Sequence, residues 1–189
     1  MASNDAELVR RARLGDEHAY SEIVERYGDD LFRLACSLVG NAADAEDAVQ
    51  ETFFGAFAKL RLFEERSSVK TWLVSILVRQ AARCRRTRWR KRTVPLGRDR
   101  TDSGTGEEEG APQGFVPAAP ESGRTEARLD VLAMLDALEP IHREVLVLRE
   151  LQGLSYDEMA EVLGVPRGTV ESRLFRARRT LKERFGSEY

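Results

Sequence analysis

Apolar residues recur three and four positions apart over most of the chain, and no stretch alternates apolar and polar residues as a strand does. Both flanks of the sequence are therefore predicted to be helical. The N-terminal part predicts helices at 4–14, 17–27, 29–39, 42–60 and 68–90. The C-terminal part predicts helices at 124–138, 140–151, 155–163 and 167–185. The fold class that follows is all-α.

Several of these helices begin at residues that suit an N-cap. Asn41 stands before the fourth expected helix, and Ser67 or Ser68 stands before the fifth. Ser155 and Glu158 have the S-x-x-E spacing of a capping box, in which side chains and backbone N–H groups bond reciprocally. These signals predict where three of the helices start.

Residues 93–125 interrupt the helical pattern. They contain four of the six prolines and six of the 14 glycines, and large apolar residues are scarce among them. Such a segment buries too little surface to offset the entropy cost of ordering it. We expect a flexible acidic linker here, joining a small helical domain at 1–92 to a second small helical domain at 126–189.

The net charge of −2, from 30 basic and 32 acidic residues, hides an uneven distribution. Residues 1–65 contain 14 acidic and seven basic residues. Residues 66–92 contain ten basic residues and no acidic one, and residues 167–184 contain seven basic and two acidic residues. Two basic segments in a chain of near-zero net charge indicate local contacts with nucleic acid.

Few residues are available for metal or redox chemistry. The chain has two cysteines, Cys36 and Cys84, and two histidines, His18 and His142, with no ligand spacing among them. We therefore expect no disulfide framework, no metal site and no cofactor, and no catalytic constellation marks the chain as an enzyme. The polar N-terminus is unlike a signal peptide and the apolar runs are too short to span a bilayer. A cytoplasmic protein without membrane insertion is expected.

Residues 155–181 have the pattern of a helix-turn-helix. Gly164 can adopt the left-handed conformation that a sharp turn needs, and Pro166 prevents the first helix from continuing. The side of the second helix opposite its apolar stripe carries Thr169, Ser172, Arg176 and Arg179, with Phe175 on the flank. Hydroxyl and guanidinium groups of this kind bind base edges and phosphates in a major groove. The alternative is the solvated face of an ordinary helical hairpin.

The expected helix at 42–60 has two different faces. The side assigned to the core consists of Ala45, Val49, Phe53, Ala56, Phe57 and Leu60. The other side, called the acidic face below, consists of Asp44, Asp47, Gln50, Glu51 and Phe54. A phenylalanine among carboxylates suggests a partner protein with a basic and apolar surface. The alternative is a phenylalanine exposed by chance.

The expected helix at 68–90 begins apolar and ends basic. Its basic side consists of Arg79, Arg83, Arg86 and Arg90. Trp72 lies near the start of the helix and Trp89 near its end. Aromatic rings beside arginines suit the stacking and backbone contacts of nucleic acids, including single strands. The alternative is a surface helix whose long basic side chains cover apolar surface.

Taken in order, these motifs resemble the extracytoplasmic-function (ECF, group IV) sigma factors of bacterial RNA polymerase, within the sigma-70 family. Residues 44–54, DAEDAVQETFF, are similar to region 2.2 of that family, and residues 67–73, SSVKTWL, to the segment that opens its −10 helix. Residues 148–156 and 168–178 are similar to region 4. The similarity covers nearly the whole chain except the expected linker.

The resemblance implies a sigma factor that binds core RNA polymerase and directs promoter-specific initiation. Region 2 would dock on the β′ clamp helices through the acidic face and would hold a flipped base of the melted −10 element. Region 4 would contact the β flap and the −35 duplex. Sigma factors of this group are commonly held by an anti-sigma factor, so the resemblance implies that partner besides promoter DNA.

Two groups of residues are assigned to the promoter on this basis. The −10 set is Phe63, Ser67, Ser68, Lys70, Thr71, Trp72, Arg79, Arg83 and Arg86. The −35 set is Arg149, Thr169, Ser172, Arg173, Phe175, Arg176 and Arg179. The chain departs from the family pattern at Arg79 and Arg83, which replace an Asn and an Asp, and at Glu64 and Glu65, which replace a basic residue and a glycine. The resemblance therefore leaves the preferred −10 sequence open.

Two other functions fit parts of the sequence. A free-standing helix-turn-helix regulator with an N-terminal interaction domain would use the C-terminal motif, but it needs no acidic docking face followed by a basic helix with tryptophans. A structural or RNA-binding adaptor would bind its partner independently of the second helix of that motif. Residues 42–92 favour the sigma factor over both.

Overall fold

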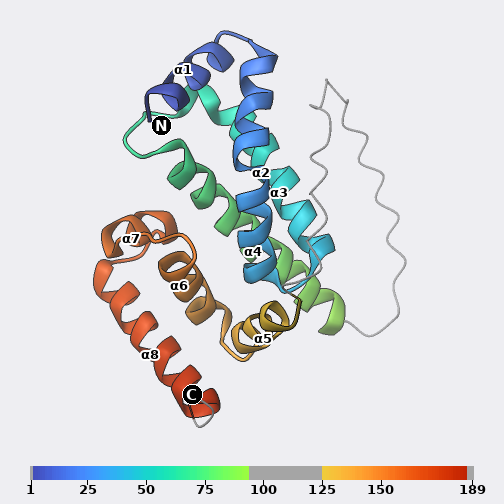
Figure 1. Cartoon of the computed structure of the whole chain (residues 1–189), viewed down its shortest axis with the longest axis vertical. Coiled ribbons are helices and arrows are strands. Elements are labelled where there is room, and N and C mark those ends of the chain that lie inside the picture. The colour runs from blue at the N-terminus through green and yellow to red at the C-terminus, as the bar shows by residue number, and fades with distance from the viewer. Residues whose placement is uncertain (1, 94–124, 187–189) are drawn as a thin grey trace.

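The structure is a computed structural model that describes residues 2–93 and 125–186. Figure 1 shows two groups of helices, and the described residues form no strand. The first group comprises α1 (Ala2–Arg13), α2 (Glu17–Val39), α3 (Ala42–Lys59), the 3-10 turn η1 (Leu60–Leu62) and α4 (Val69–Thr93). The second comprises α5 (Thr125–Asp136), α6 (Pro140–Glu150), α7 (Tyr156–Leu163) and α8 (Arg167–Phe185). The all-α prediction is confirmed, whereas the linker predicted at 93–125 lies, except for its end residues, outside the described residues.

α2 corrects one expectation. The sequence predicts two helices at 17–27 and 29–39, but the structure has one continuous helix of 23 residues. The prediction is wrong because Gly28 is buried inside the helix, where the packing of its neighbours outweighs the ~1 kcal/mol cost of a helical glycine. α2 begins after Asp16, whose side chain accepts a hydrogen bond from the Ala19 N–H at 3.1 Å.

The predicted caps of α3 and α4 are confirmed. The Asn41 side chain accepts a hydrogen bond from the N–H of Asp44 at 2.9 Å, which starts α3. Of the two candidate serines before α4, Ser68 accepts one from the N–H of Thr71 at 3.0 Å. These short polar side chains satisfy N–H groups that have no partner inside their own helix.

α2, α3 and α4 pack together, and α1 lies across one end of them (Figure 1). Their core includes Leu8, Ile23, Leu31, Leu38, Leu73 and Leu77. Ala45, Val49, Phe53, Ala56 and Leu60 are buried as predicted. Phe57 is wrongly assigned to the core, because it is 47% exposed at the edge of the bundle and packs edge-on against Tyr20, with ring centroids 4.9 Å apart.

The predicted helix-turn-helix is confirmed in α7 and α8. Ser155 and Glu158 form both bonds of the capping box that starts α7. α7 ends at Gly164, which has a left-handed φ of 64°. Met159 and Val170 are fully buried in the core that these two helices share with α6.

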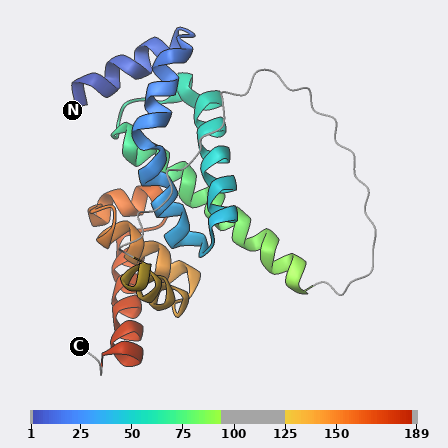
Figure 2. The same cartoon turned by 45° about the vertical axis from the view of Figure 1, so that its right-hand side comes forward.

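The two groups of helices touch each other through α6 on α2 and α7 on α4 (Figures 1 and 2). Arg85 of α4 and Arg143 of α6 both donate hydrogen bonds to the backbone carbonyl of Leu38, at 3.0 and 3.5 Å. Arg85 also pairs with Glu144 of α6. Guanidinium groups stabilise the end of α2 because the last carbonyls of a helix carry partial negative charge.

Candidate nucleic-acid and polymerase interfaces

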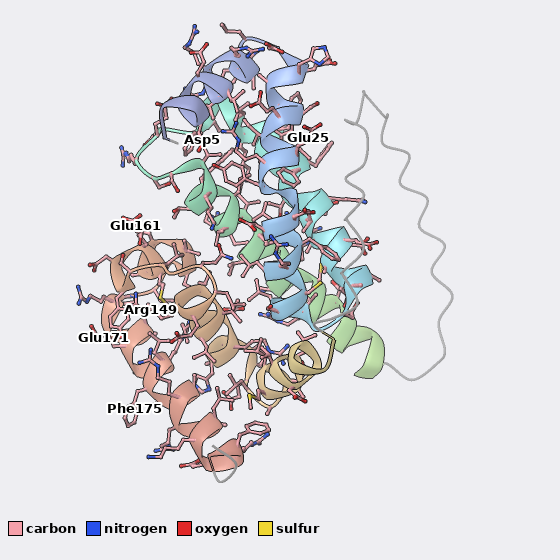
Figure 3. The ribbon with its side chains drawn as sticks, in the orientation of Figure 1. Asp5, Glu25, Arg149, Glu161, Glu171 and Phe175 are labelled. Atoms are coloured by element: carbon pink, nitrogen blue, oxygen red, sulfur yellow. The ribbon has the colours of Figure 1, made fainter. Side chains whose placement is uncertain are left out.

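α8 presents the polar side of the helix-turn-helix to solvent. Its buried stripe consists of Val170, Leu174 and Ala177. The exposed members of the −35 set on this helix are Ser172, Phe175, Arg176 and Arg179. Phe175 has 68% of its surface exposed, and Figure 3 shows it pointing away from the rest of the molecule. Thr169 and Arg173 are half-buried. One long helix thus brings most of the −35 set together.

Ion pairs decide which charges of α8 are available to DNA. Arg167 lies 3.1 Å from Asp157 and 3.0 Å from Glu171, and its hydrogen bond to Glu171 is the main reason that its pKa is raised. Because Arg167 neutralises Glu171, that carboxylate repels a phosphate less. Arg176 makes no ion pair within the part of the chain that the structure describes. Its full charge therefore faces solvent.

Arg149 lies at the end of α6, on a different helix from the rest of the −35 set. Its guanidinium donates a hydrogen bond to the carbonyl of Leu154 at 2.8 Å and lies over the Tyr156 ring, 5.4 Å from the centroid. Arg167 lies over the same ring at 5.8 Å. Arg149 therefore braces the turn that leads into α7, and it is half-buried there.

The acidic face of α3 forms one wall of a groove between α3 and α4. The groove is lined by Asn41, Asp44, Asp47, Gln50, Glu51, Gln80, Arg83, Cys84 and Thr87. Burial raises the pKa of the Cys84 thiol, and the negative charges of Asp44, Asp47 and Glu51 raise it further. Phe54, also of the acidic face, is 59% exposed. The groove therefore has negative charge on its α3 side, Phe54 lies on the same helix outside the groove lining, and Arg83 of the −10 set lines the groove from α4.

The −10 set divides between the loop from η1 to the start of α4 and the later turns of α4. Its exposed or half-buried members are Ser67, Ser68, Lys70, Trp72, Arg79, Arg83 and Arg86. Phe63 is buried, and its ring stacks on Trp72 with centroids 4.7 Å apart. Thr71 is buried too, and its Oγ1 lies 2.9 Å from the Oγ of Ser68. The loop and the first turn of α4 thus present hydroxyls and a half-buried tryptophan, and the arginines follow further along α4.

Two segments match families of known proteins. Residues 23–91 match Sigma-70 region 2, and residues 128–181 match Sigma-70, region 4. The RNA polymerase sigma-H factor of Pseudomonas aeruginosa is 34% identical over 184 residues, which cover 94% of this chain and 91% of that protein. The ECF RNA polymerase sigma factor SigE of Mycolicibacterium smegmatis is 36% identical over 180 residues, which cover 89% of this chain but 63% of that protein. The chain belongs to the ECF sigma factors of the sigma-70 family.

A solved structure supports the arrangement of this ECF sigma factor. The sigma factor RpoE of Bartonella quintana, solved in complex with the anti-sigma factor NepR, is 27% identical and superposes with a TM-score of 0.68. The match covers 90% of this chain and 98% of that one. ECF sigma factors bind RNA polymerase and direct promoter-specific initiation, and as a class they are not enzymes.

Two contacts of this ECF sigma factor have no signal in its sequence. Arg13 of α1 reaches the loop before α4, and Arg85 of α4 reaches Glu144 of α6. Each contact joins residues far apart in the chain, so neither periodicity nor motif spacing reveals it. None of the helices that the structure describes has both the length and the apolar character of a bilayer-spanning segment.

Proposed function

We propose that this protein joins core RNA polymerase and directs initiation by reading the −10 and −35 promoter elements. Residues 1–92 bind polymerase and the −10 element, residues 126–189 bind the −35 element, and residues 93–125 link the two domains. The observation that carries the proposal is the exposed side of α8, where Ser172, Phe175 and Arg176 project from a helix whose other side is buried.

The −35 set acts on duplex DNA in the major groove. Arg176 is solvent-exposed and, among the described residues, unpaired, so it can donate two hydrogen bonds to one guanine, the commonest specific arginine contact. Phe175 supplies an apolar surface of the kind that contacts thymine methyl groups. Arg149 holds the turn before α7 and so orients α8 for these contacts.

The acidic face docks on the β′ clamp helices of core polymerase. Its carboxylates meet basic groups of the partner, while Phe54 contributes the apolar area that dominates affinity at interface centres. Region 4 meets the β flap of the same polymerase. These contacts bring the −10 and −35 sets onto the promoter together.

The loop before α4 holds a flipped base of the melted −10 element. Extruding a base costs a few kcal/mol, so contacts between the base and the loop must offset that cost. The hydroxyls of Ser67 and Ser68 can bond to base edges, and the accessible part of Trp72 offers a ring for stacking. Arg79 and Arg86 lie further along α4 and bind phosphates of the opened strands.

An anti-sigma factor is part of this proposal. The Bartonella quintana relative was solved with such a partner, and the superposition extends over both groups of helices. The protein acts in the cytoplasm, where polymerase and chromosome meet, without inserting into a membrane. It has no catalytic activity of its own and needs no cofactor.

A band-shift experiment tests the proposal. Duplex DNA carrying both promoter elements is mixed with the full chain, with and without core polymerase. The proposal predicts a sequence-specific complex only when core polymerase is present, and a weaker one with Phe54→Ala. A specific complex of the chain with duplex DNA in the absence of polymerase, unchanged when polymerase is added, would instead indicate a free-standing regulator.

A further inference from the structure

The loop before α4 contains an unusual backbone conformation. Glu65 has a φ of 57°, and it is the one non-glycine residue with positive φ in the part of the chain that the structure describes. An L-residue adopts this left-handed conformation at a cost of about 1 kcal/mol, whereas glycine adopts it freely. Such a conformation persists only where the surroundings hold it.

Arg13, at the end of α1, supplies that support. Its Nη1 lies 2.9 Å from the carboxylate of Glu65, and its Nε donates to the carbonyl of Leu60 at 3.1 Å. Its Nη2 donates to the carbonyl of Phe63. One planar side chain thus binds three points of the segment 60–65, which the rigid fork of a guanidinium suits and a lysine does not.

α1 itself is anchored, so the position of the Arg13 guanidinium is fixed. Near the start of the helix, Asp5 pairs with Arg26 and accepts a hydrogen bond from the hydroxyl of Tyr27 at 2.6 Å (Figure 3 labels Asp5). Leu8 and Val9 are buried under the same helix. The Arg13 side chain is 27% exposed, so its contacts are only partly screened by water.

The contacts of Arg13 reach the −10 set through Phe63. The guanidinium carbon lies 6.0 Å from the centre of the Phe63 ring, and that ring stacks on Trp72. The position of Trp72 at the start of α4 therefore depends on a residue of α1. Because the region 2 match begins at residue 23, Arg13 lies outside it.

We propose that Arg13 is a positioning residue for −10 recognition. It holds Glu65 in its left-handed conformation and fixes the Phe63–Trp72 stack, so that the loop has its base-binding shape before the promoter opens. A loop that must be ordered during base capture binds more weakly than one that is already ordered. Arg13 also neutralises Glu65, whose carboxylate would otherwise repel DNA. This inference rests on the proposed function, in which this loop reads the −10 element.

Run-off transcription with full-length protein and core polymerase tests the inference. Arg13→Met should lower transcription from a promoter with a matched −10 element by about tenfold, which corresponds to about 1.4 kcal/mol. It should also reduce the ratio of transcription from that promoter to transcription from a promoter with a substituted −10 element. The matched control is Arg10→Met, because Arg10 lies on the same helix, is exposed and pairs only with Glu7 among the described residues. This control should transcribe like the wild type.

A second substitution separates positioning from a general loss of structure. Glu65→Gly removes both the backbone cost and the carboxylate that Arg13 neutralises, so adding it to Arg13→Met should restore much of the lost transcription and preference. Arg13→Lys keeps the charge but not the fork, so it should fall between wild type and Arg13→Met. Affinity for core polymerase should stay within about twofold in all variants, since the acidic face is not altered.

Failure of the Arg13 inference and failure of the proposed function give different results in these experiments. A wild type that drives no promoter-dependent transcript overturns the proposed function. A wild type that does so, with Arg13→Met equal to Arg10→Met, overturns the inference alone. Loss of core affinity together with transcription, without recovery by Glu65→Gly, would mean that Arg13 only maintains the fold, and it would overturn the positioning role.

Discussion

Arg85 of α4 donates a hydrogen bond to the carboxylate of Glu144 in α6, and the same guanidinium donates to the carbonyl of Leu38 in α2. The Arg85 and Glu144 side chains are 19% and 11% exposed. A charge left in so buried a place without its partner is strongly unfavourable. The pair therefore fixes region 4 against region 2 in this arrangement.

Arg85→Met should weaken the contact between the two regions. The variant leaves Glu144 without its cation, and we expect the free energy of unfolding to fall by about 3 kcal/mol and the radius of gyration to increase. Urea denaturation and small-angle scattering measure these two quantities. Arg86→Met, at the adjacent exposed position, should change neither. Equal effects of the two variants would contradict the role of the ion pair.

The turn of the helix-turn-helix offers a matched pair of glycines. Gly164 has a φ of 64°, whereas Gly168 lies inside α8 without a positive φ, and neither has atoms within 4 Å of an added Cβ. Gly164→Ala should therefore destabilise the protein by about 1 kcal/mol through backbone strain alone. Gly168→Ala should be neutral or stabilise it by up to about 1 kcal/mol, because alanine favours the helix. Thermal unfolding of both variants checks the contrast, and a destabilised Gly168→Ala with an unaffected Gly164→Ala would refute it.

The capping box of α7 predicts a dependence of stability on pH. The backbone N–H and hydroxyl of Ser155 donate to the Glu158 carboxylate and lower its pKa below the ordinary 4.5. A lowered pKa in the folded state means that the stabilisation is complete above the unfolded-state pKa and is lost as the pH falls through the folded-state pKa. The stability difference between wild type and Glu158→Ala should therefore be largest at neutral pH and shrink in acid. Urea titrations over this range measure it, and a difference that grows in acid would have the wrong sign.

Local features of the fold are predictable from the sequence because they depend on neighbouring residues. Asn41, Ser155 and Gly164 mark helix ends through their own side chains or backbone freedom, and the structure confirms each. Gly28 misleads because a glycine alone does not break a helix whose faces are buried. Phe57 misleads because helical spacing places a residue on a face but does not say where the bundle ends.

The candidate site is predictable where it follows one helix, and not where it joins several. The exposed side of α8 follows directly from the period of the helix. The contact of Arg13 with Glu65 depends on how α1 crosses the bundle, which no local pattern specifies. The same holds for Arg83. The helical period groups it with the other arginines of α4, but the structure places it in the lining of the groove beside the acidic face.

Phe54→Ala should weaken binding to core polymerase. The ring is 59% exposed in the free protein, so its removal changes the docking surface without emptying the core. We expect a loss of about 1–2 kcal/mol in binding free energy, typical of an aromatic residue at an interface centre. Fluorescence anisotropy of labelled protein with core polymerase measures the affinity. Phe175→Ala should leave that affinity unchanged, and a loss of similar size there would show that exposed aromatics in general, not the acidic face, govern docking.

Arg176→Ala should relax recognition of the −35 element. We expect the binding free energy to weaken by about 1–3 kcal/mol with the preferred duplex and by less with a mismatched one, because a guanidinium bonded to a base edge discriminates between bases. Arg178→Ala removes the same charge from a residue that already pairs with Glu150 at 2.9 Å. It should weaken both duplexes to the same small extent. Competition band shifts with polymerase holoenzyme provide the comparison. Equal discrimination between the two duplexes by both variants would show that Arg176 does not recognise a base.

Transcription of whole genomic DNA from the source organism tests the central claim most directly. Purified core polymerase is supplied with this protein or without it, and the 5′ ends of all transcripts are sequenced. The account predicts a discrete set of start sites that require the protein and share one −35 element and one −10 element at a constant spacing. Start sites that are the same with and without the protein would contradict the account.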